Sequence, residues 1–178
     1  MSFSKVRQDD PKAPCISLIG MAGAGKSTLA PLLAAALDWA HLDTDHHIEA
    51  YYALPLQGVY DRYGHEEFLK IEERLVSELM LHRTVISTGG SVIYGREAMS
   101  TLGKLGPVVH LAVGEEEFLQ RVGAGDDRGL AIAPGMTLSD LYRERQPLYR
   151  AAADITVRTD DCTPEQCVRA ILDKVNLA

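Results

Sequence analysis

Gly20 to Thr28 form a glycine-rich stretch that contains Lys26 and Ser27, between a short apolar run and an Ala/Leu-rich helical pattern. Glycines let successive backbone N–H groups curl around phosphate oxygens, and the N-terminus of the following helix adds its dipole. We expect Lys26 to reach the β- and γ-phosphates of a nucleotide and the Ser27 hydroxyl to bind Mg²⁺. A glycine-rich turn without a ligand is the alternative, but the predicted strand, the helix and the Lys-Ser pair all indicate nucleotide binding.

Two carboxylates, Asp43 and Asp45, follow the second predicted strand. Because side chains alternate along a strand, we expect both to point the same way, at the carboxyl end of the sheet where α/β folds place their sites. One carboxylate would hold hydrated Mg²⁺, and the other would accept a proton from an attacking hydroxyl. Capping of the next helix by Asp45 is the alternative that needs no function.

Two further features can bind a small acceptor. Gly89 and Gly90 follow the third predicted strand, in a turn whose backbone N–H groups can approach a ligand closely. Arg145 lies just before Pro147 in a helical pattern, and its guanidinium can hold a carboxylate or a phosphate with two parallel hydrogen bonds. A solvated helix arginine is the ordinary alternative for Arg145.

A glycine-rich segment at about 123–136 carries Arg128 and has no secondary-structure pattern of its own. Loops of this length inside compact domains are usually functional or disordered. We expect a lid that closes over the nucleotide, with a plain surface loop as the alternative.

The composition predicts a single soluble domain. The chain has 178 residues, 46% of them hydrophobic, and a formal net charge of −7, which disfavours nucleic acid as a partner. Cys15, Cys162 and Cys167 lack metal-finger spacing and fit a reduced, cytoplasmic protein. No apolar run is long enough to span a membrane. We expect residues 1–14 to be a disordered or frayed leader and residues 15–178 to be one domain.

Alternating apolar runs and amphipathic patterns predict an α/β fold with a parallel sheet covered by helices on both faces. The predicted strands are Cys15–Ile19, His41–Asp43, Thr84–Ser87, Val108–Ala112 and Asp154–Val157. The predicted helices are Lys26–Ala36, Leu56–Tyr63, Glu66–His82, Glu97–Leu105, Glu115–Arg121, Leu138–Ala152 and Pro164–Val175.

Taken together, these motifs resemble the shikimate kinase family, which has the P-loop nucleoside-monophosphate-kinase-like fold. The resemblance runs from about Cys15 to the C-terminus. It rests on the phosphate loop, Leu-Asp-Thr-Asp-His-His-Ile-Glu at 42–49, Phe68 with Glu72, Thr-Gly-Gly at 88–90, Arg121 with Arg128, and Arg-Gln-Pro-Leu-Tyr at 145–149.

The resemblance implies a three-layer α/β/α fold with a five-stranded parallel sheet in the order 2-3-1-4-5 and a flexible lid. It further implies a monomeric, ATP-dependent enzyme of aromatic amino acid biosynthesis that phosphorylates shikimate. Mg²⁺ would lie near Ser27 and Asp43, and the lid would carry Arg128. The remaining nucleotide contacts would come from Gly20, Gly23, Ala24, Gly25, Lys26, Thr28 and Arg121. Asp45 would orient and deprotonate the acceptor hydroxyl, Gly89 and Gly90 would line the acceptor pocket, and Arg145 would grip the acceptor carboxylate.

Two positions depart from the family pattern on the acceptor side. Leu69 stands where the family carries a second arginine for the acceptor carboxylate, and Ser91 stands where it carries a third glycine. Loss of one hydrogen-bonded ionic partner typically costs about 2–5 kcal/mol. Shikimate is therefore one expected acceptor, and another small hydroxylated anion, such as a homoserine-like amino acid or a sugar acid, is the alternative. A nucleotide-binding regulator without catalysis is a third possibility.

Overall fold

The structure is a computed structural model that describes residues 14–123, 130–133 and 135–175 of the chain. Its centre is a five-stranded parallel sheet in the order β2-β3-β1-β4-β5, as the resemblance implied. The strands are β1 (Ile16–Ile19), β2 (Ala40–Asp43), β3 (Thr84–Ser87), β4 (Val108–Ala112) and β5 (Ile155–Arg158). The predicted α/β class and strand order are therefore confirmed.

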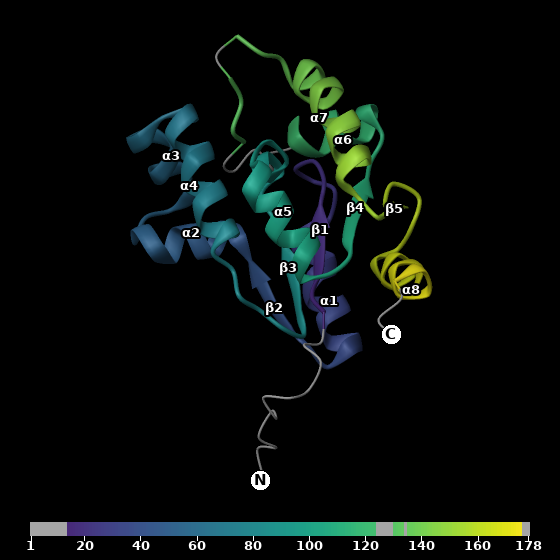
Figure 1. Cartoon of the computed structure of the whole chain (residues 1–178). Coiled ribbons are helices and arrows are strands. Elements are labelled where there is room, and N and C mark those ends of the chain that lie inside the picture. The colour runs from purple at the N-terminus through teal and green to yellow at the C-terminus, as the bar shows by residue number, and fades with distance from the viewer. Residues whose placement is uncertain (1–13, 124–129, 134, 176–178) are drawn as a thin grey trace.

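Helices cover both faces of this sheet (Figure 1). They are α1 (Lys26–Leu37), α2 (Thr44–Tyr52), α3 (Leu56–Tyr63), α4 (His65–Ser77), α5 (Arg96–Leu105), α6 (Glu115–Gly123), α7 (Leu138–Ala152) and α8 (Pro164–Lys174), with a 3₁₀ helix, η1 (Gly90–Tyr94). Helices α1 and α8 pack together, α4 packs on α5, and α7 contacts β4.

The central strands are buried on both sides because helices flank them. Every residue of β1 and β3 is buried, and these strands read as short continuous runs rather than as alternating patterns. Apolar side chains from β1, β4, α1 and α5 form the main core, which includes Leu18, Leu33, Leu102 and Val109. The sheet thereby becomes a rigid base for the loops at its carboxyl edge.

A second apolar cluster lies between α2, α3 and α4, which gather beside the β2 edge of the sheet (Figure 1). Its buried members are Ile48, Leu56, Val59, Phe68, Ile71, Leu75 and Ala131. In α4 the apolar residues recur at three-to-four spacing, as an amphipathic helix requires. These three helices therefore form a small unit with its own core.

Two elements differ from the sequence prediction. The helix predicted over 66–82 ends at Ser77, because Leu79 and Leu81 pack against the main core and Arg83, at φ 48°, turns the chain into β3. A helix that the sequence analysis did not predict, α2, begins directly after Asp43. Asp43 ends β2, as predicted, and its side chain caps this helix.

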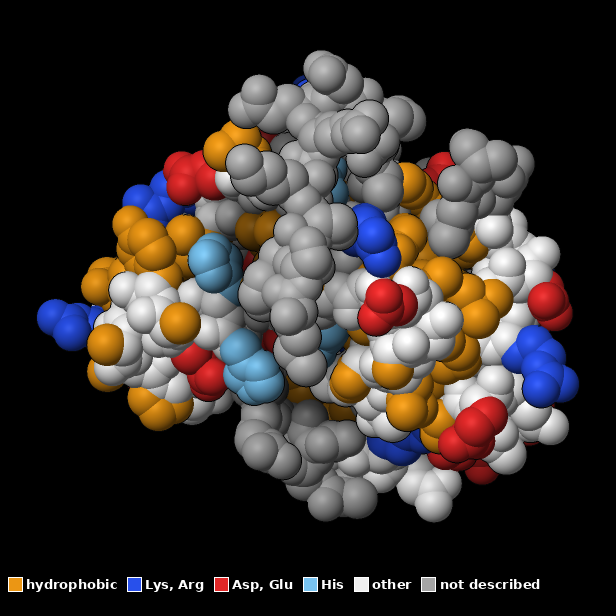
Figure 2. Space-filling view, turned by 90° about the horizontal axis from the view of Figure 1, so that it is seen from below, with side chains coloured by type: hydrophobic (Ala, Val, Ile, Leu, Met, Phe, Trp, Pro, Cys, Tyr) orange, Lys and Arg blue, Asp and Glu red, His pale blue; other side chains and the backbone are white. Residues whose placement is uncertain are grey.

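Acidic and basic side chains are interspersed on the face shown in Figure 2. Within the described ranges, none of the helices combines the length and the apolar character that a membrane span needs. Residues 1–13 of the predicted leader and half of the predicted lid (123–136) fall outside the described residues, so both stay predictions.

Candidate active site

A cavity of roughly 570 Å³ lies at the carboxyl edge of the sheet. Its wall is formed by the segments that follow β1, β2 and β3, together with side chains from α4, α6 and α7. Parallel α/β sheets place their ligand sites at this edge. Most of the residues selected from the sequence meet here.

The phosphate loop connects β1 to α1. Gly23 and Gly25 have φ angles of 69° and 94°, which glycine adopts without strain. A Cβ at Gly20 would lie 2.6 Å from the carbonyl oxygen of Leu111, so the loop requires a glycine there as well. Gly23, Gly25, Ser27 and Thr28 line the cavity, and the start of α1 points its N–H groups toward it.

Lys26 lies inside this loop. Its Nζ atom donates hydrogen bonds of 2.7 Å to the carbonyl oxygens of Gly20 and Met21, and its side chain is buried. Burial lowers the pKa of Lys26 to about 8, against the opposing effect of Asp45 and Asp43. Backbone carbonyls thus hold this ammonium inside the loop whose N–H groups could bind phosphate oxygens.

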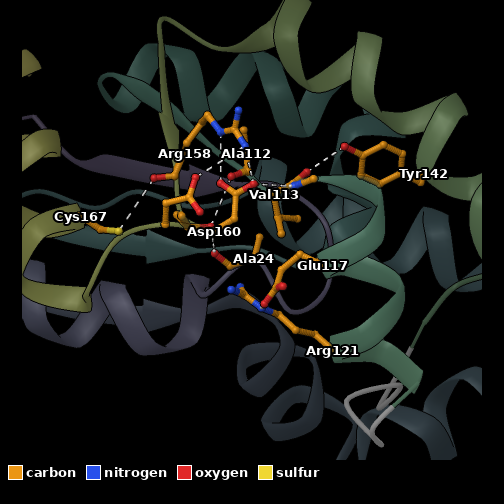
Figure 3. A network of polar contacts seen from close by, with 12 residues as sticks. Ala24, Ala112, Val113, Glu117, Arg121, Tyr142, Arg158, Asp160 and Cys167 are labelled. Atoms are coloured by element: carbon orange, nitrogen blue, oxygen red, sulfur yellow. Dashed lines mark hydrogen bonds and ion pairs between the residues drawn. The ribbon is translucent and has the colours of Figure 1, made fainter.

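Neighbouring elements hold the loop from behind (Figure 3). Arg121 of α6 donates 2.8 Å hydrogen bonds to the carbonyl of Gly23 and to Glu117. The Thr159 hydroxyl, after β5, donates to the Ala24 carbonyl at 3.0 Å. Ala24 and Gly20 do not line the cavity and contribute through the loop backbone, whereas Arg121 does line it.

The Asp43 carboxylate connects three elements. Its Oδ2 atom accepts hydrogen bonds from Ser27 (3.2 Å) and Ser87 (2.8 Å), and its Oδ1 atom accepts one from the backbone N–H of Asp45 (3.0 Å). Ser27 therefore lies beside Asp43, and both face the cavity.

These oxygens suit a hard divalent cation. Mg²⁺ commonly takes one or two protein oxygens and completes its shell with phosphate and water. In the described part of the chain, no group of three or more His, Cys, Asp or Glu residues is arranged to hold a metal ion. A cation at Ser27 and Asp43 would therefore need phosphate oxygens as further ligands.

Asp45 lies in the first turn of α2, so the two carboxylates share the cavity through the start of this helix and not through strand alternation as expected. The side chain lines the cavity beside Asp43. Burial and the neighbouring Asp43 charge raise the pKa of Asp45 to about 6, and Lys26 opposes that rise. A carboxyl group with such a pKa is suited to accept a proton near neutral pH.

Gly89 and Gly90 form the part of the cavity wall that lies beside α2. The N–H of Gly89 donates to the Thr44 hydroxyl at 3.1 Å, and the Gly90 carbonyl accepts a 2.5 Å hydrogen bond from Tyr149. A Cβ at Gly90 would lie 3.1 Å from Arg145 Nη1. Both glycines thus allow charged side chains to approach the turn.

Arg145 is buried in α7, with 1% of its surface exposed, and it lines the cavity. Its Nη2 donates to the carbonyl of Ala131 at 2.7 Å and its Nε to the Tyr94 hydroxyl at 3.2 Å. The solvated-arginine alternative is therefore excluded. Its orientation toward the cavity suits a ligand carboxylate.

Of the residues selected on the acceptor side, Leu69 does not reach the cavity wall. It is half-buried and packs against the second apolar cluster, while its neighbour Phe68 lines the cavity. Lys70 is exposed and pairs with Glu67 at 3.2 Å. Arg128 lies outside the described residues.

The sequence analysis did not assign a site role to Glu72. Its side chain is 1% exposed, and burial followed by the nearby Asp45 raises its pKa to about 8. The available signal was its position: Glu72 falls within the apolar stripe of α4, next to Ile71 and one turn after Phe68. A carboxylate at such a position indicates either a buried partner or a function.

The arrangement is suited to phosphoryl transfer. A loop of backbone N–H groups with a lysine and two oxygens that could bind a metal ion can hold a nucleoside triphosphate. A carboxylate base and a buried arginine lie in the same cavity, where they can position a small hydroxylated anion.

Comparisons with known proteins agree with this geometry. The family model described as "Shikimate kinase" matches residues 22–176. The shikimate kinase of Chromohalobacter salexigens is 38% identical over 162 residues, which cover 89% of this chain and 90% of that protein. The structure of shikimate kinase from Acinetobacter baumannii in complex with shikimate has a TM-score of 0.80 at 30% identity, over 90% of this chain and 91% of that chain.

A more distant structure shares the fold alone. Thymidylate kinase from Candida albicans has a TM-score of 0.63 at 14% identity, over 91% of this chain and 90% of its own. The family match spans most of the chain, and the phosphate loop, the carboxylate pair and the buried arginine occupy one cavity. The chain therefore belongs to the shikimate kinase family and is a small-molecule kinase.

Proposed function

We propose that this chain transfers the γ-phosphoryl group of ATP, bound with Mg²⁺, to a hydroxyl of a small carboxylated metabolite. Shikimate is the proposed acceptor and shikimate 3-phosphate the product, a step of aromatic amino acid biosynthesis. The observation that carries the proposal is the buried Arg145 guanidinium in the same cavity as Asp45 and the phosphate loop. The relative from Acinetobacter baumannii, whose structure contains shikimate, supports this choice of acceptor.

On the donor side, the loop N–H groups and Lys26 would bind the phosphates. Lys26 would exchange its two carbonyl partners, Gly20 and Met21, for phosphate oxygens. Ser27 and Asp43 would hold Mg²⁺, which neutralises phosphate charge when bound. Arg128, predicted to act from the lid, stays a prediction.

On the acceptor side, Arg145 would bind the carboxylate while Gly89 and Gly90 would allow close approach of the ring. Asp45 would orient the attacking hydroxyl and take its proton. Asp43 would hold the first turn of α2 in place through its hydrogen bond from the Asp45 N–H. The described residues of one chain supply all of these groups, consistent with the expected monomer.

A second acceptor class is favoured by one observation. Leu69 packs in an apolar cluster, and the cationic residues among those described at the cavity wall are Lys26, Arg121 and Arg145, of which two belong to the phosphate loop region. An anion that needs one arginine only, such as a hydroxy amino acid or a sugar acid, would suit this wall. The non-catalytic alternative is disfavoured, because Asp45 lies next to a complete phosphate loop.

Coupled measurement of ADP release tests the proposal. Shikimate, homoserine, threonine and gluconate are supplied one at a time with MgATP, and the phosphorylated product is identified by phosphorus NMR. We expect acceptor-dependent ADP release with shikimate. If no acceptor stimulates ATP use while ATP binds, the kinase proposal is wrong for this chain. The alternative of a nucleotide-binding regulator without catalysis is then supported.

A further inference from the structure

Two cysteines meet at the corner where β5 leads into α8. Cys162 is exposed in the turn before the helix, and Cys167 is buried near the start of the helix. Both carry free thiols, and neither belongs to the groups of the proposed reaction. Thiols that lie together at the surface can react with one another, so their surroundings decide what this pair can do.

The local sequence brings the two side chains together. Thr163 is the N-cap of α8: its hydroxyl accepts a hydrogen bond from the Gln166 N–H at 3.3 Å, and Gln166 Oε1 accepts one from the Thr163 N–H at 2.9 Å. This capping box fixes how the chain enters the helix. The residue before the cap then packs against the fourth residue of the helix, and these two positions are Cys162 and Cys167.

The Cys167 thiol lies against both the end of β5 and Cys162. Its Sγ donates to the carbonyl of Arg158 at 4.0 Å, the contact drawn in Figure 3. Burial raises the pKa of Cys167, and Cys162, which is hydrogen-bonded to it, raises it further, while Arg121 opposes the rise. The buried thiol is therefore kept protonated, in direct contact with the side chain of Cys162.

The two thiols differ in access. A reagent in solution can reach the exposed Cys162, whereas Cys167 is 2% exposed. When an exposed thiol reacts and a second thiol lies in contact with it, the second one displaces the adduct and a disulfide results. Cys15 is fully buried at the start of β1 and provides an internal comparison.

The geometry points to a thiol-oxidation site: we infer that Cys162 and Cys167 form an intramolecular disulfide by exchange with a low-molecular-weight disulfide, such as oxidised glutathione. This site is separate from the proposed phosphoryl transfer. It adjoins the donor half of the cavity, because Thr159, in the same β5–α8 connection, donates to the Ala24 carbonyl of the phosphate loop at 3.0 Å. The bond would tie this connection to α8.

The exchange takes place in two balanced steps. Cys162 loses its proton to solvent, and its sulfur attacks one sulfur of the reagent. The S–S bond of the reagent breaks, one thiolate leaves, and a mixed disulfide remains on Cys162. The Cys167 sulfur then attacks the sulfur of Cys162, its proton goes to solvent, and the second thiolate leaves. The two protein thiols lose two electrons, and the reagent gains them and becomes two thiols.

The first test uses the unmodified chain. The protein is incubated with oxidised glutathione, free thiols are then alkylated, and trypsin digestion is followed by mass spectrometry. Both cysteines fall in the tryptic peptide 159–169. We expect this peptide to be lighter by two hydrogens and to resist alkylation. A peptide that stays alkylated, or that keeps glutathione on Cys162, would overturn the inference.

Three variants assign the steps to particular residues. Cys167→Ser lacks the second thiol, so the glutathione adduct should persist on Cys162. Cys162→Ser should react at least about tenfold more slowly, because the remaining thiol is buried. Cys15→Ala is the matched control, since it keeps the pair, and it should form the disulfide at the wild-type rate. A Cys162→Ser protein that reacts as fast as the wild type would contradict the assigned order.

Stability provides a second readout. Because the bond restricts the unfolded chain, oxidised wild type should unfold at a higher temperature than reduced wild type, and Cys162→Ser should show no such shift. The side chains are already in contact, so KM for ATP should change by about threefold or less. A lower unfolding temperature on oxidation would mean that the bond distorts this corner and would overturn the site. Both mass and stability can be measured without any acceptor, so failure of the kinase proposal does not affect this test.

Discussion

The donor half and the acceptor half of the cavity are built in different ways. In the donor half, contiguous backbone from Gly20 to Thr28 forms the binding surface, and outside side chains such as Thr159 and Arg121 bond to its carbonyls. In the acceptor half, isolated side chains from α2, α4 and α7 converge, and charged groups are buried among apolar ones. The donor half is therefore held by contacts within one loop and its neighbours, whereas the acceptor half depends on how separate helices are packed, and there Glu72 Oε1 has no hydrogen-bond partner among the described residues.

The largest effect is expected where the two halves meet, at Asp45. Asp45→Asn keeps the shape of the side chain but removes the proton acceptor, so kcat should fall by about 10³-fold. The dissociation constant for ATP, measured by calorimetry, should stay within about threefold, since removal of this base leaves the phosphate loop intact. A kcat within tenfold of the wild-type value would remove Asp45 from its proposed role.

The next largest effect is expected at Arg145. Arg145→Lys keeps the charge but loses the planar fork that holds a carboxylate with two hydrogen bonds. We expect kcat/KM for the acceptor to fall by about 30-fold or more, with little change in KM for ATP. An equal loss for both substrates would mean that Arg145 supports the whole cavity and not its acceptor half.

Glu72 predicts an unusual dependence of stability on pH in the ligand-free protein. Its carboxyl pKa rises from 4.5 to about 8 on folding, so between these values the folded state binds more protons than the unfolded state. The contribution of Glu72 to stability then falls as pH rises from about 5 to 8, because a raised acidic pKa favours the protonated folded form at low pH.

Glu72→Gln removes this dependence. Urea unfolding at pH 5.5 and at pH 8.5 should show that the variant is more stable than the wild type at the higher pH by about 1–3 kcal/mol, with a smaller difference at the lower pH. Glu67→Gln should follow the wild type at both values. A difference between wild type and Glu72→Gln that does not change between the two pH values would contradict the buried, proton-holding state of Glu72.

A smaller effect is expected at Tyr149, which supports the acceptor half from behind. Its hydroxyl donates to the Gly90 carbonyl, and its ring stacks on His110 at a centroid distance of 5.2 Å. Tyr149→Phe keeps the stacking and leaves the carbonyl unpaired, at a cost of about 1 kcal/mol. We expect KM for the acceptor to rise about fivefold while KM for ATP stays constant. Equal changes in both would indicate a general loss of structure.

The corresponding substitution in the donor half is Thr159→Val, with the smallest expected effect. It removes the hydrogen bond to Ala24, but the loop keeps its bonds from Lys26 and Arg121. KM for ATP should rise by about threefold or less, and the kinetics of the acceptor should not change. A tenfold increase would mean that the phosphate loop depends on single contacts, as the acceptor half does.

The same contrast explains what the sequence could predict. The phosphate loop, its strand and its helix are adjacent in the chain, so their residue types and spacing contain the necessary information. The buried runs of β1, β3 and β4 likewise indicated a parallel sheet, and the strand order followed from the resemblance. Local signals were sufficient for these elements.

The acceptor half depends on packing between distant segments. The sequence did not show that Arg145 is buried, that Leu69 turns toward the second apolar cluster, or that Glu72 lies beside Asp45. Each of these facts depends on how α4 and α7 are placed against the sheet. The helix α2 was missed for a related reason: Asp43 caps it directly from the strand, so no loop of turn-forming residues marks its start.

The placement of α2, α3 and α4 has a consequence for redesign. These helices occupy one uninterrupted stretch, Thr44 to Ser77, inserted between β2 and β3, which pair side by side in the sheet. The stretch supplies Asp45, Phe68 and Glu72 and contains most of a separate apolar cluster. This stretch can therefore be exchanged as one segment. A chimera that carries the corresponding residues of a relative would change the acceptor-side residues of α2 and α4 and keep the phosphate loop from Gly20 to Thr28.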